Sequence, residues 1–216
     1  MKNVKRNFCI AAGLLAAFVL WTVAVCYIDV QAVGPRGSCV GFATVNRFVH
    51  NLTGVNMMLY VITDWLGLVP IAVCLGFAIF GLFQWINRKH FLKVDFSILV
   101  LGVFYIVTMA IYILFEFVVI NRRPTLIDGY LETSYPSSTT MLVLCVMPTA
   151  LMQFNVHIKN NFIRKAVIFV VVVFIVFMVA GRLISGVHWL SDIIGGAIVS
   201  SGLVLMYHSV CKCFIK

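Results

Sequence analysis

The polar residues best suited to chemistry in this 216-residue chain lie near its C-terminal end, between two apolar stretches. Arg182 ends one stretch, and His188 and Asp192 stand at the start of the next. Residues four apart share one face of a helix, so the carboxylate of Asp192 can hold the His188 imidazole in one tautomer. The second ring nitrogen is then free to act as a nucleophile. A purely structural ion pair is the alternative that this spacing leaves open.

A second polar group separates two earlier apolar stretches. Arg122 and Arg123 end the first of these, and Pro136-Ser137-Ser138-Thr139 begins the second. Proline and serine favour a helix start at this point, and the free N–H groups of a helix start bind anions. A guanidinium group can bind two phosphate oxygens at once through two parallel hydrogen bonds. A single arginine at a membrane margin can also simply extend its charged end toward water. Together these residue types predict a phosphate site.

The order and spacing of both groups resemble the three motifs of the type 2 phosphatidic acid phosphatase (PAP2) superfamily over roughly residues 60–210. The pattern of Arg182, five residues, His188, three residues and Asp192 is the most specific part of the resemblance. The resemblance implies hydrolysis of a lipid phosphate or diphosphate without a metal or another cofactor. His188 would form a phosphohistidine and Asp192 would orient it. The phosphate would be held by Arg123, Arg182, Ser137 and Ser138.

All three motifs depart from the family pattern. Glu116 replaces the lysine of the first motif, Thr139 replaces the general-acid histidine of the second, and Gly181 replaces the serine of the third. Arg122 is a candidate substitute for the lost lysine, and Glu116 is a candidate substitute acid. General acid catalysis is worth about 10²–10⁴-fold, and an alkoxide leaving group needs it more than a phosphate does. The departures therefore predict a preference for diphosphates over monoesters.

Composition defines the setting of this site. Hydrophobic residues make up 62% of the chain and charged residues 11%, which no water-soluble domain of this size can bury. The net charge of +9 is spread in short clusters between apolar runs, so it forms no continuous basic face for nucleic acid. No His, Cys, Asp or Glu cluster has the spacing of metal ligands. The sequence thus predicts a single integral membrane domain over residues 1–216.

Runs long enough to cross a bilayer as helices lie near residues 7–28, 65–87, 96–120, 139–156, 163–184 and 189–211. They predict an all-α, six-helix transmembrane bundle, with kinks possible at Pro70 and Pro148. The first run follows basic residues as a signal peptide does, but its apolar core is longer than that of a signal peptide. Between the first two runs, apolar residues at helical spacing predict a short interfacial helix, namely Phe42, Val45, Val49 and Leu52.

Basic residues set the expected orientation. With six spans and the N-terminus inside, eleven of the sixteen Lys and Arg residues face the cytoplasm and five face out. The positive-inside rule therefore predicts a multi-pass cell-membrane protein with both termini cytoplasmic and the site on the outer side. The inner group is Lys2, Lys5, Arg6, Arg88, Lys89, Lys93, Lys159, Arg164, Lys165, Lys212 and Lys216, and the outer group is Arg36, Arg47, Arg122, Arg123 and Arg182.

Several other functions fit parts of the pattern. A chain with eroded motifs could bind lipid phosphates without hydrolysing them. A six-helix transporter or scaffold would carry the motifs by coincidence. Vanadate-dependent haloperoxidases share the motif set, but they are soluble and use the residues that differ here. The lipid bilayer and a lipid phosphate or diphosphate remain the expected partners, and the sequence does not indicate an oligomeric state.

Overall fold

The structure is a computed structural model that describes residues 2–214, so the basic residue Lys216 lies outside the described part. Helices dominate these residues and no strand occurs among them, which confirms the predicted all-α class. Two short 3-10 turns accompany the α-helices, η1 (Pro35–Gly37) and η2 (Phe91–Lys93). The α-helices are α1 (Lys2–Tyr27), α2 (Ala43–Thr53), α3 (Met57–Leu66), α4 (Leu68–Arg88), α5 (Phe96–Phe117), α6 (Ser138–His157), α7 (Asn161–Ile184) and α8 (Leu190–Phe214).

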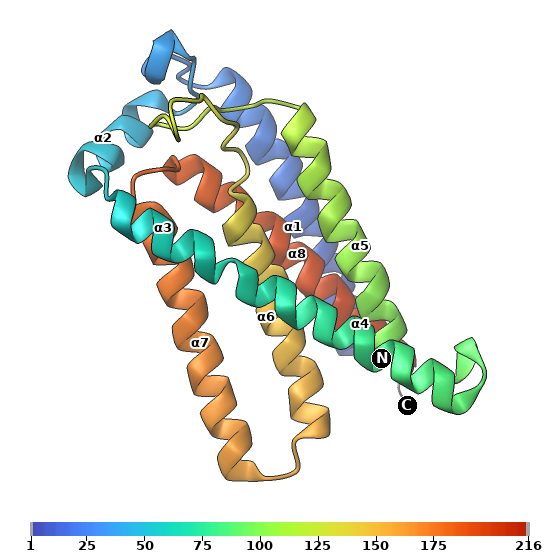
Figure 1. The fold of residues 1–216 in the computed structure, drawn as a ribbon. Helices are drawn as coiled ribbons and strands as arrows, with labels where there is room; N and C mark the ends of the chain where they lie inside the picture. Colours follow the sequence, from blue (N-terminus) through green and yellow to red (C-terminus); the bar gives the residue numbers. More distant parts are fainter. Residues whose placement is uncertain (1, 215–216) are drawn as a thin grey trace.

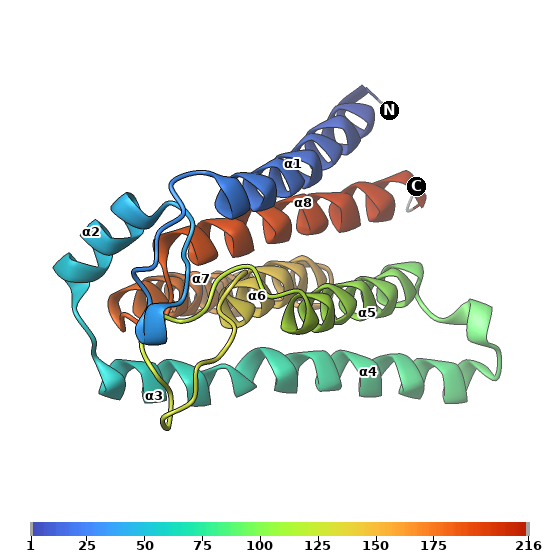
Figure 2. The ribbon, with the colours of Figure 1, turned by 90° about the horizontal axis from the view of Figure 1, so that it is seen from above.

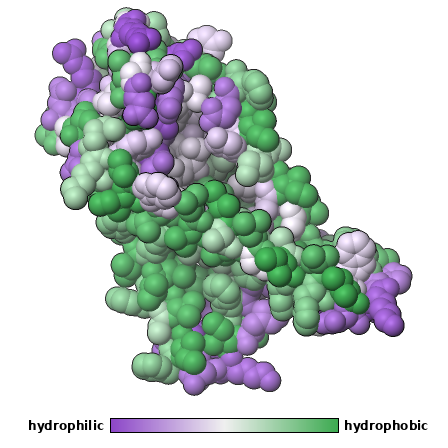
Figure 3. All heavy atoms as spheres, viewed as in Figure 1, coloured by the Kyte–Doolittle hydropathy of each residue, from purple (hydrophilic) through white to green (hydrophobic). Residues whose placement is uncertain are grey.

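Six helical segments among residues 2–214 are long and apolar enough to cross a membrane, which confirms a multi-pass chain. On the face shown in Figure 3, apolar side chains cover the middle of the molecule, between two polar ends. Among the apolar side chains of the spans, Leu20, Ile106 and Phe169 are each 70% exposed. A continuous apolar surface of this kind needs a covering in water, whereas hydrocarbon solvates it directly.

The bundle is built around α8. Helix α1 packs along one side of α8 and α6 packs along another, while α5 and α7 complete the surroundings (Figures 1 and 2). Helices α3 and α4 form an outer layer that crosses α6 and α7 obliquely. The main core cluster joins α1, α5, α6 and α8 through Phe18, Phe104, Met141, Val199 and Tyr207. These contacts hold fixed the helices on which the motif residues stand.

The second span begins earlier than the sequence indicates. It runs over Met57–Arg88, whereas the apolar run predicts a start near residue 65. Asn56 caps the start, since its side-chain oxygen accepts a hydrogen bond from the Leu59 N–H at 3.0 Å. Helices α3 and α4 meet at Gly67, close to the predicted break at Pro70, whose ring disrupts the helix four residues earlier. Helix α6, in contrast, continues across Pro148.

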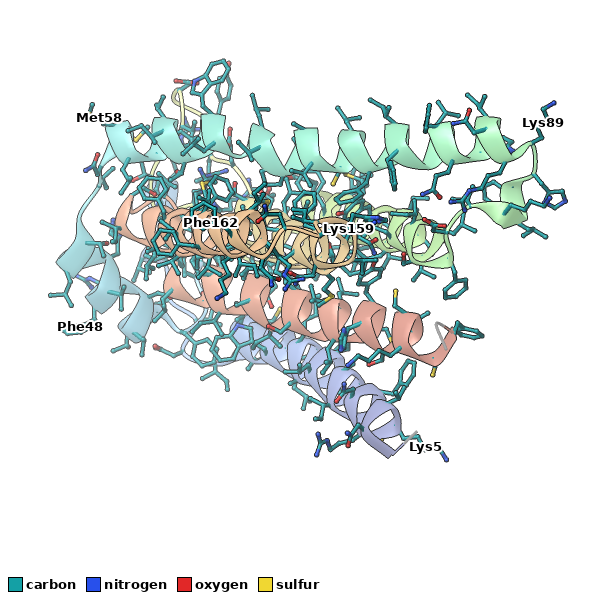
Figure 4. The ribbon with its side chains drawn as sticks, turned by 90° about the horizontal axis from the view of Figure 1, so that it is seen from below. Lys5, Phe48, Met58, Lys89, Lys159 and Phe162 are labelled. Atoms are coloured by element: carbon teal, nitrogen blue, oxygen red, sulfur yellow. The ribbon has the colours of Figure 1, made fainter. Side chains whose placement is uncertain are left out.

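The connections between the helices divide between the two ends of the bundle. Both termini, the α4–α5 turn and the α6–α7 turn lie at the end that carries Lys5 and Lys89 (Figures 1 and 4). The opposite end carries α2, with Phe48 and Met58, and the long α5–α6 loop. The motif residues stand at this second end, away from the termini.

Helix α2 is the expected short helix between the first two spans. Its apolar side chains Val45, Phe48 and Leu52 are exposed, as they would be against lipid headgroups. The opposite face is anchored by Asn46, which is 1% exposed. The Asn46 amide donates to the Gly41 carbonyl at 2.7 Å and to Ser191 Oγ at 2.8 Å, and its oxygen accepts from the Ser191 N–H at 3.0 Å. These bonds fix α2 to the start of α8.

Asn46→Ala is expected to lower the unfolding free energy by about 1–3 kcal/mol, because it leaves buried partners at Gly41 and Ser191 unpaired. Thermal unfolding of the detergent-solubilised protein measures the effect as a lower midpoint temperature. Asn51→Ala is the matched control, since Asn51 lies exposed on the same helix. Equal midpoints for the two variants would show that Asn46 does not anchor α2.

Candidate active site

A polar cavity of about 590 Å³ opens at the end of the bundle away from the termini. Its cover is the loop between α5 and α6, which folds back on itself through an antiparallel bridge between Arg122 and Thr133. The Arg123 N–H donates to the Glu132 carbonyl at 3.1 Å, and the Ser134 N–H donates to the Asn121 carbonyl at 3.0 Å. The loop thereby places its arginines over the ends of α6 and α8. Motif residues in the cavity wall are Glu116, Arg122, Arg123, Ser138, Thr139, Arg182 and His188.

His188 faces this cavity from the turn between α7 and α8. Its Nδ1 lies 3.2 Å from the Ser134 carbonyl oxygen, which can only accept, so Nδ1 carries the proton. Nε2 lies 3.3 Å from Arg182 Nη2, which can only donate, so Nε2 presents its lone pair. Both neighbours therefore select one tautomer, and Nε2 is the nitrogen available to attack a ligand.

The electrostatics around His188 keep its ring neutral. Burial lowers the pKa of His188 well below its ordinary value, and the positive charges of Arg123 and Arg182 lower it further. The Ser134 hydrogen bond opposes this shift but does not overcome it. A neutral imidazole is the form required of a nucleophile.

His188 precedes α8, so it does not share a helical face with Asp192, which lies in the first turn of α8 and does not bond to the ring directly. Its Oδ2 is 3.9 Å from His188 Nδ1. The same oxygen accepts from Ser134 Oγ at 2.8 Å and from the Trp189 N–H at 2.9 Å, while Oδ1 accepts from Asn121 at 3.0 Å. Asp192 therefore fixes both ends of the loop to α8, and through Ser134 it positions the carbonyl that orients His188.

Arg182 and Arg123 lie together against the ring of Tyr60. Their guanidinium carbons are 5.0 and 5.8 Å from the ring centroid. Arg123 Nε is 3.0 Å from Glu132 Oε2, an ion pair without the direction of a hydrogen bond. Arg123 Nη1 and Arg182 Nε are buried without a partner. Buried N–H groups without partners are costly, so an anion that accepts from them would be bound tightly.

Only part of the second motif lines the cavity. Ser138 and Thr139 line the cavity at the first turn of α6. The structure does not bring Ser137 into the lining, because Ser137 is completely buried and its N–H donates to the Asp192 carbonyl at 3.1 Å. Ser137 therefore joins α6 to α8 instead of facing a ligand.

The two candidate substitutes from the sequence both reach the cavity wall. Arg122 Nη1 donates to the Leu131 carbonyl at 2.9 Å, and its own carbonyl accepts from Trp189 Nε1 at 2.7 Å. Glu116 Oε2 accepts from Thr133 Oγ1 at 2.9 Å. Both side chains are thus engaged with the covering loop.

Helix α3 contributes two cavity residues that the motifs do not include. Tyr60 and Asp64 lie one helical turn apart, and Asp64 Oδ1 is 3.5 Å from Arg182 Nη1. A Cβ atom added at Gly181 would lie 2.7 Å from Thr63 Cγ2, so the glycine permits the close approach of α3 to α7. Asp64 is the one carboxylate inside the second span, and such a residue is a functional candidate by default.

An apolar groove continues from the polar cavity between α4 and α5. Its upper part has a volume of about 360 Å³ and shares Asp64, Tyr112, Ser138, Thr139 and Met141 with the cavity. Its lower part, of about 570 Å³, shares Cys74 and Tyr105 with the upper part. A polar compartment and an apolar compartment therefore meet at one common wall. Within residues 2–214, no three His, Cys, Asp or Glu side chains gather as metal ligands.

Comparison with known proteins agrees with this architecture. The PAP2 superfamily model matches residues 116–213. No curated protein matches the sequence. The fold is similar to the crystal structure of a transmembrane PAP2-type phosphatidylglycerolphosphate phosphatase from Bacillus subtilis, with a TM-score of 0.57 and 18% sequence identity. That alignment covers 94% of this chain and 96% of the other. The family match over residues 116–213 and the shared fold confirm the resemblance to the PAP2 superfamily seen in the sequence.

Proposed function

We propose that this protein hydrolyses a lipid phosphate or lipid diphosphate through a phosphohistidine at His188. The observation that carries the proposal is the orientation of His188 in the wall of the polar cavity, where its unprotonated Nε2 accepts from Arg182 at 3.3 Å. The match of residues 116–213 to the PAP2 superfamily model supports a phosphatase. The apolar groove that adjoins the cavity supports a substrate with a lipid tail.

In the first step, His188 Nε2 attacks phosphorus, an N–P bond forms, and the bond from phosphorus to the lipid oxygen breaks. Arg182 and Arg123 hold the phosphate oxygens as charge shifts during this step. The ring becomes cationic, and the Ser134 carbonyl and the nearby Asp192 carboxylate stabilise that charge. In the second step, water cleaves the N–P bond, which releases inorganic phosphate and restores the neutral ring.

The cavity lies at the bundle end opposite the termini, and the basic residues near the termini support a cytoplasmic location for that end. We therefore place the site at the outer surface of the membrane, within one domain that spans the chain. Accessibility of a cysteine introduced at Asp128, in the α5–α6 loop, to a membrane-impermeant thiol reagent in intact cells tests this orientation. Labelling only after permeabilisation would reverse it.

Phosphate release by the detergent-purified protein tests the activity. We expect release from a polyprenyl diphosphate and from phosphatidic acid, in the presence of a chelator and with His188→Ala as the inactive control. Thr139 in place of a histidine favours a second candidate, a protein that binds lipid phosphates without turnover. Saturable binding with no release above the His188→Ala variant would establish that second function instead.

A further inference from the structure

We infer that Asp64 of α3 is the catalytic acid of this protein and protonates the leaving oxygen of the lipid. The inference rests on the proposed phosphatase activity and deepens it. It addresses the missing histidine at position 139, which leaves the reaction without its expected proton donor.

The position of Asp64 at the wall between the two compartments carries the inference. The phosphoryl group belongs in the polar cavity with the arginines, and the tail belongs in the apolar groove. The oxygen that joins them must then lie at the common wall. Asp64, Ser138 and Thr139 line both compartments there, and Asp64 is the only one of these three with an acidic side chain.

Glu116 is less suitable for the same role. It lines the polar cavity but not the apolar groove, and its carboxylate already accepts from Thr133. The geometry therefore favours Asp64 over the substitute that the sequence indicates.

The departures from the family motifs are consistent with this role for α3. Gly181 leaves room for Thr63, which brings Asp64 within 3.5 Å of Arg182. Thr139 is shorter than histidine, and its methyl lies 3.7 Å from the position of a Cβ atom added at Gly67. The junction of α3 and α4 thus lies beside position 139. Asp64, near the end of α3, places a carboxyl group in the same wall.

Arg182 links Asp64 to the phosphate site. Without ligand, Arg182 contacts both Asp64 and His188. A bound phosphate that accepts from Arg182 would therefore lie beside the Asp64 carboxyl. The charged and titratable groups that share the cavity with Asp64 are Tyr60, Tyr112, Glu116, Arg122, Arg123, Glu132, Arg182 and His188.

The proton balance is closed over the two steps. When the bond from phosphorus to the lipid oxygen breaks, the Asp64 carboxyl gives its proton to that oxygen, and the lipid leaves as an alcohol. When water then attacks the phosphohistidine, the Asp64 carboxylate accepts the water proton. Inorganic phosphate leaves, and Asp64 is again protonated for the next turnover.

Leaving-group dependence tests the inference. Asp64→Asn is assayed on a polyprenyl monophosphate and on the diphosphate with the same tail. We expect kcat/KM for the monophosphate to fall by about 10²–10⁴-fold, because alkoxide departure needs the acid. The diphosphate should lose less than about tenfold, since phosphate is a better leaving group. Asp64→Glu should recover a large part of the monophosphate activity.

The controls separate this inference from the proposed function. Asp128→Asn, in the exposed loop tip, is the matched control and should leave both rates unchanged. Equal losses on both substrates in Asp64→Asn, or a monophosphate-selective loss in Glu116→Gln, would overturn the role of Asp64 while the phosphatase stands. Absence of His188-dependent release in the unaltered protein would overturn both. Activity on the diphosphate shows that each variant is folded.

Discussion

His188→Ala is expected to lower the turnover rate by at least about 10⁴-fold, because no other side chain in the cavity presents an uncharged nitrogen nucleophile. The nucleophile and its supporting groups accelerate the reaction only together. Without the nucleophile, only the part of the rate acceleration that comes from substrate binding remains. Initial rates of phosphate release, with lipid diphosphate at saturation, measure the loss. Binding of the substrate should change much less, since Arg123 and Arg182 remain.

His208→Ala is the matched control for this variant, because His208 lies on α8 toward the end of the bundle that carries the termini. Its rate should stay within about threefold of the unaltered protein. Rapid quench with a labelled substrate should also trap phosphate on the unaltered protein as an acid-labile, alkali-stable label. Turnover that persists in His188→Ala, or a label that survives in that variant, would exclude His188 as the nucleophile.

Arg182→Lys is expected to lower kcat by about 10²–10³-fold, the usual effect of removing one aligned donor from a charge-stabilising site. Lysine keeps the positive charge but not the planar pair of donors that contacts His188 and Asp64 from one group. The side chain is 1% exposed, so solvent cannot replace the missing donor. Single-turnover rates of phosphohistidine formation separate this effect from substrate binding.

Arg164→Lys is the matched control, because it makes the same substitution in the same helix. Arg164 lies in the first turns of α7, at the end of the bundle away from the cavity. It should keep both its rate and its thermal midpoint. A kcat for Arg182→Lys close to that of Arg164→Lys would show that Arg182 supports the fold and not the reaction.

Hydropathy predicted the membrane spans well because lipid requires long, continuous apolar helices. The predicted six-span, all-α arrangement is confirmed, together with the short helix before the second span. The start of the second span was missed for a physical reason. Asp64 interrupts the apolar run eight residues into the helix, and the capping residue Asn56 is visible only once that helix is extended backward.

Seven motif residues line one cavity, but their partners could not be predicted from the sequence. The group that orients His188 is a backbone carbonyl at Ser134, and every residue carries such a carbonyl. Ser137 fits the motif by type, yet its N–H is used by the Asp192 carbonyl. Spacing predicts which residues share a turn, whereas these choices depend on how the loop folds onto α8.

The contribution of α3 depends on contacts between distant parts of the chain. Tyr60 and Asp64 reach the arginines because α3 packs on α7, where Gly181 faces Thr63. A lone glycine in an apolar helix carries no sequence signal for a particular partner. A carboxylate within a membrane span does carry one, so Asp64 could have been identified as a site candidate from the sequence once the span was drawn correctly.

The common wall between the polar cavity and the apolar groove has a consequence for the fate of the products. A lipid cleaved at that wall separates into a fragment that only water dissolves and a fragment that only the bilayer dissolves. Under the proposed function, phosphate would leave through the polar cavity and the alcohol through the apolar groove between α4 and α5. Recombination would require both fragments to return at once, so this geometry would oppose the reverse of the proposed reaction.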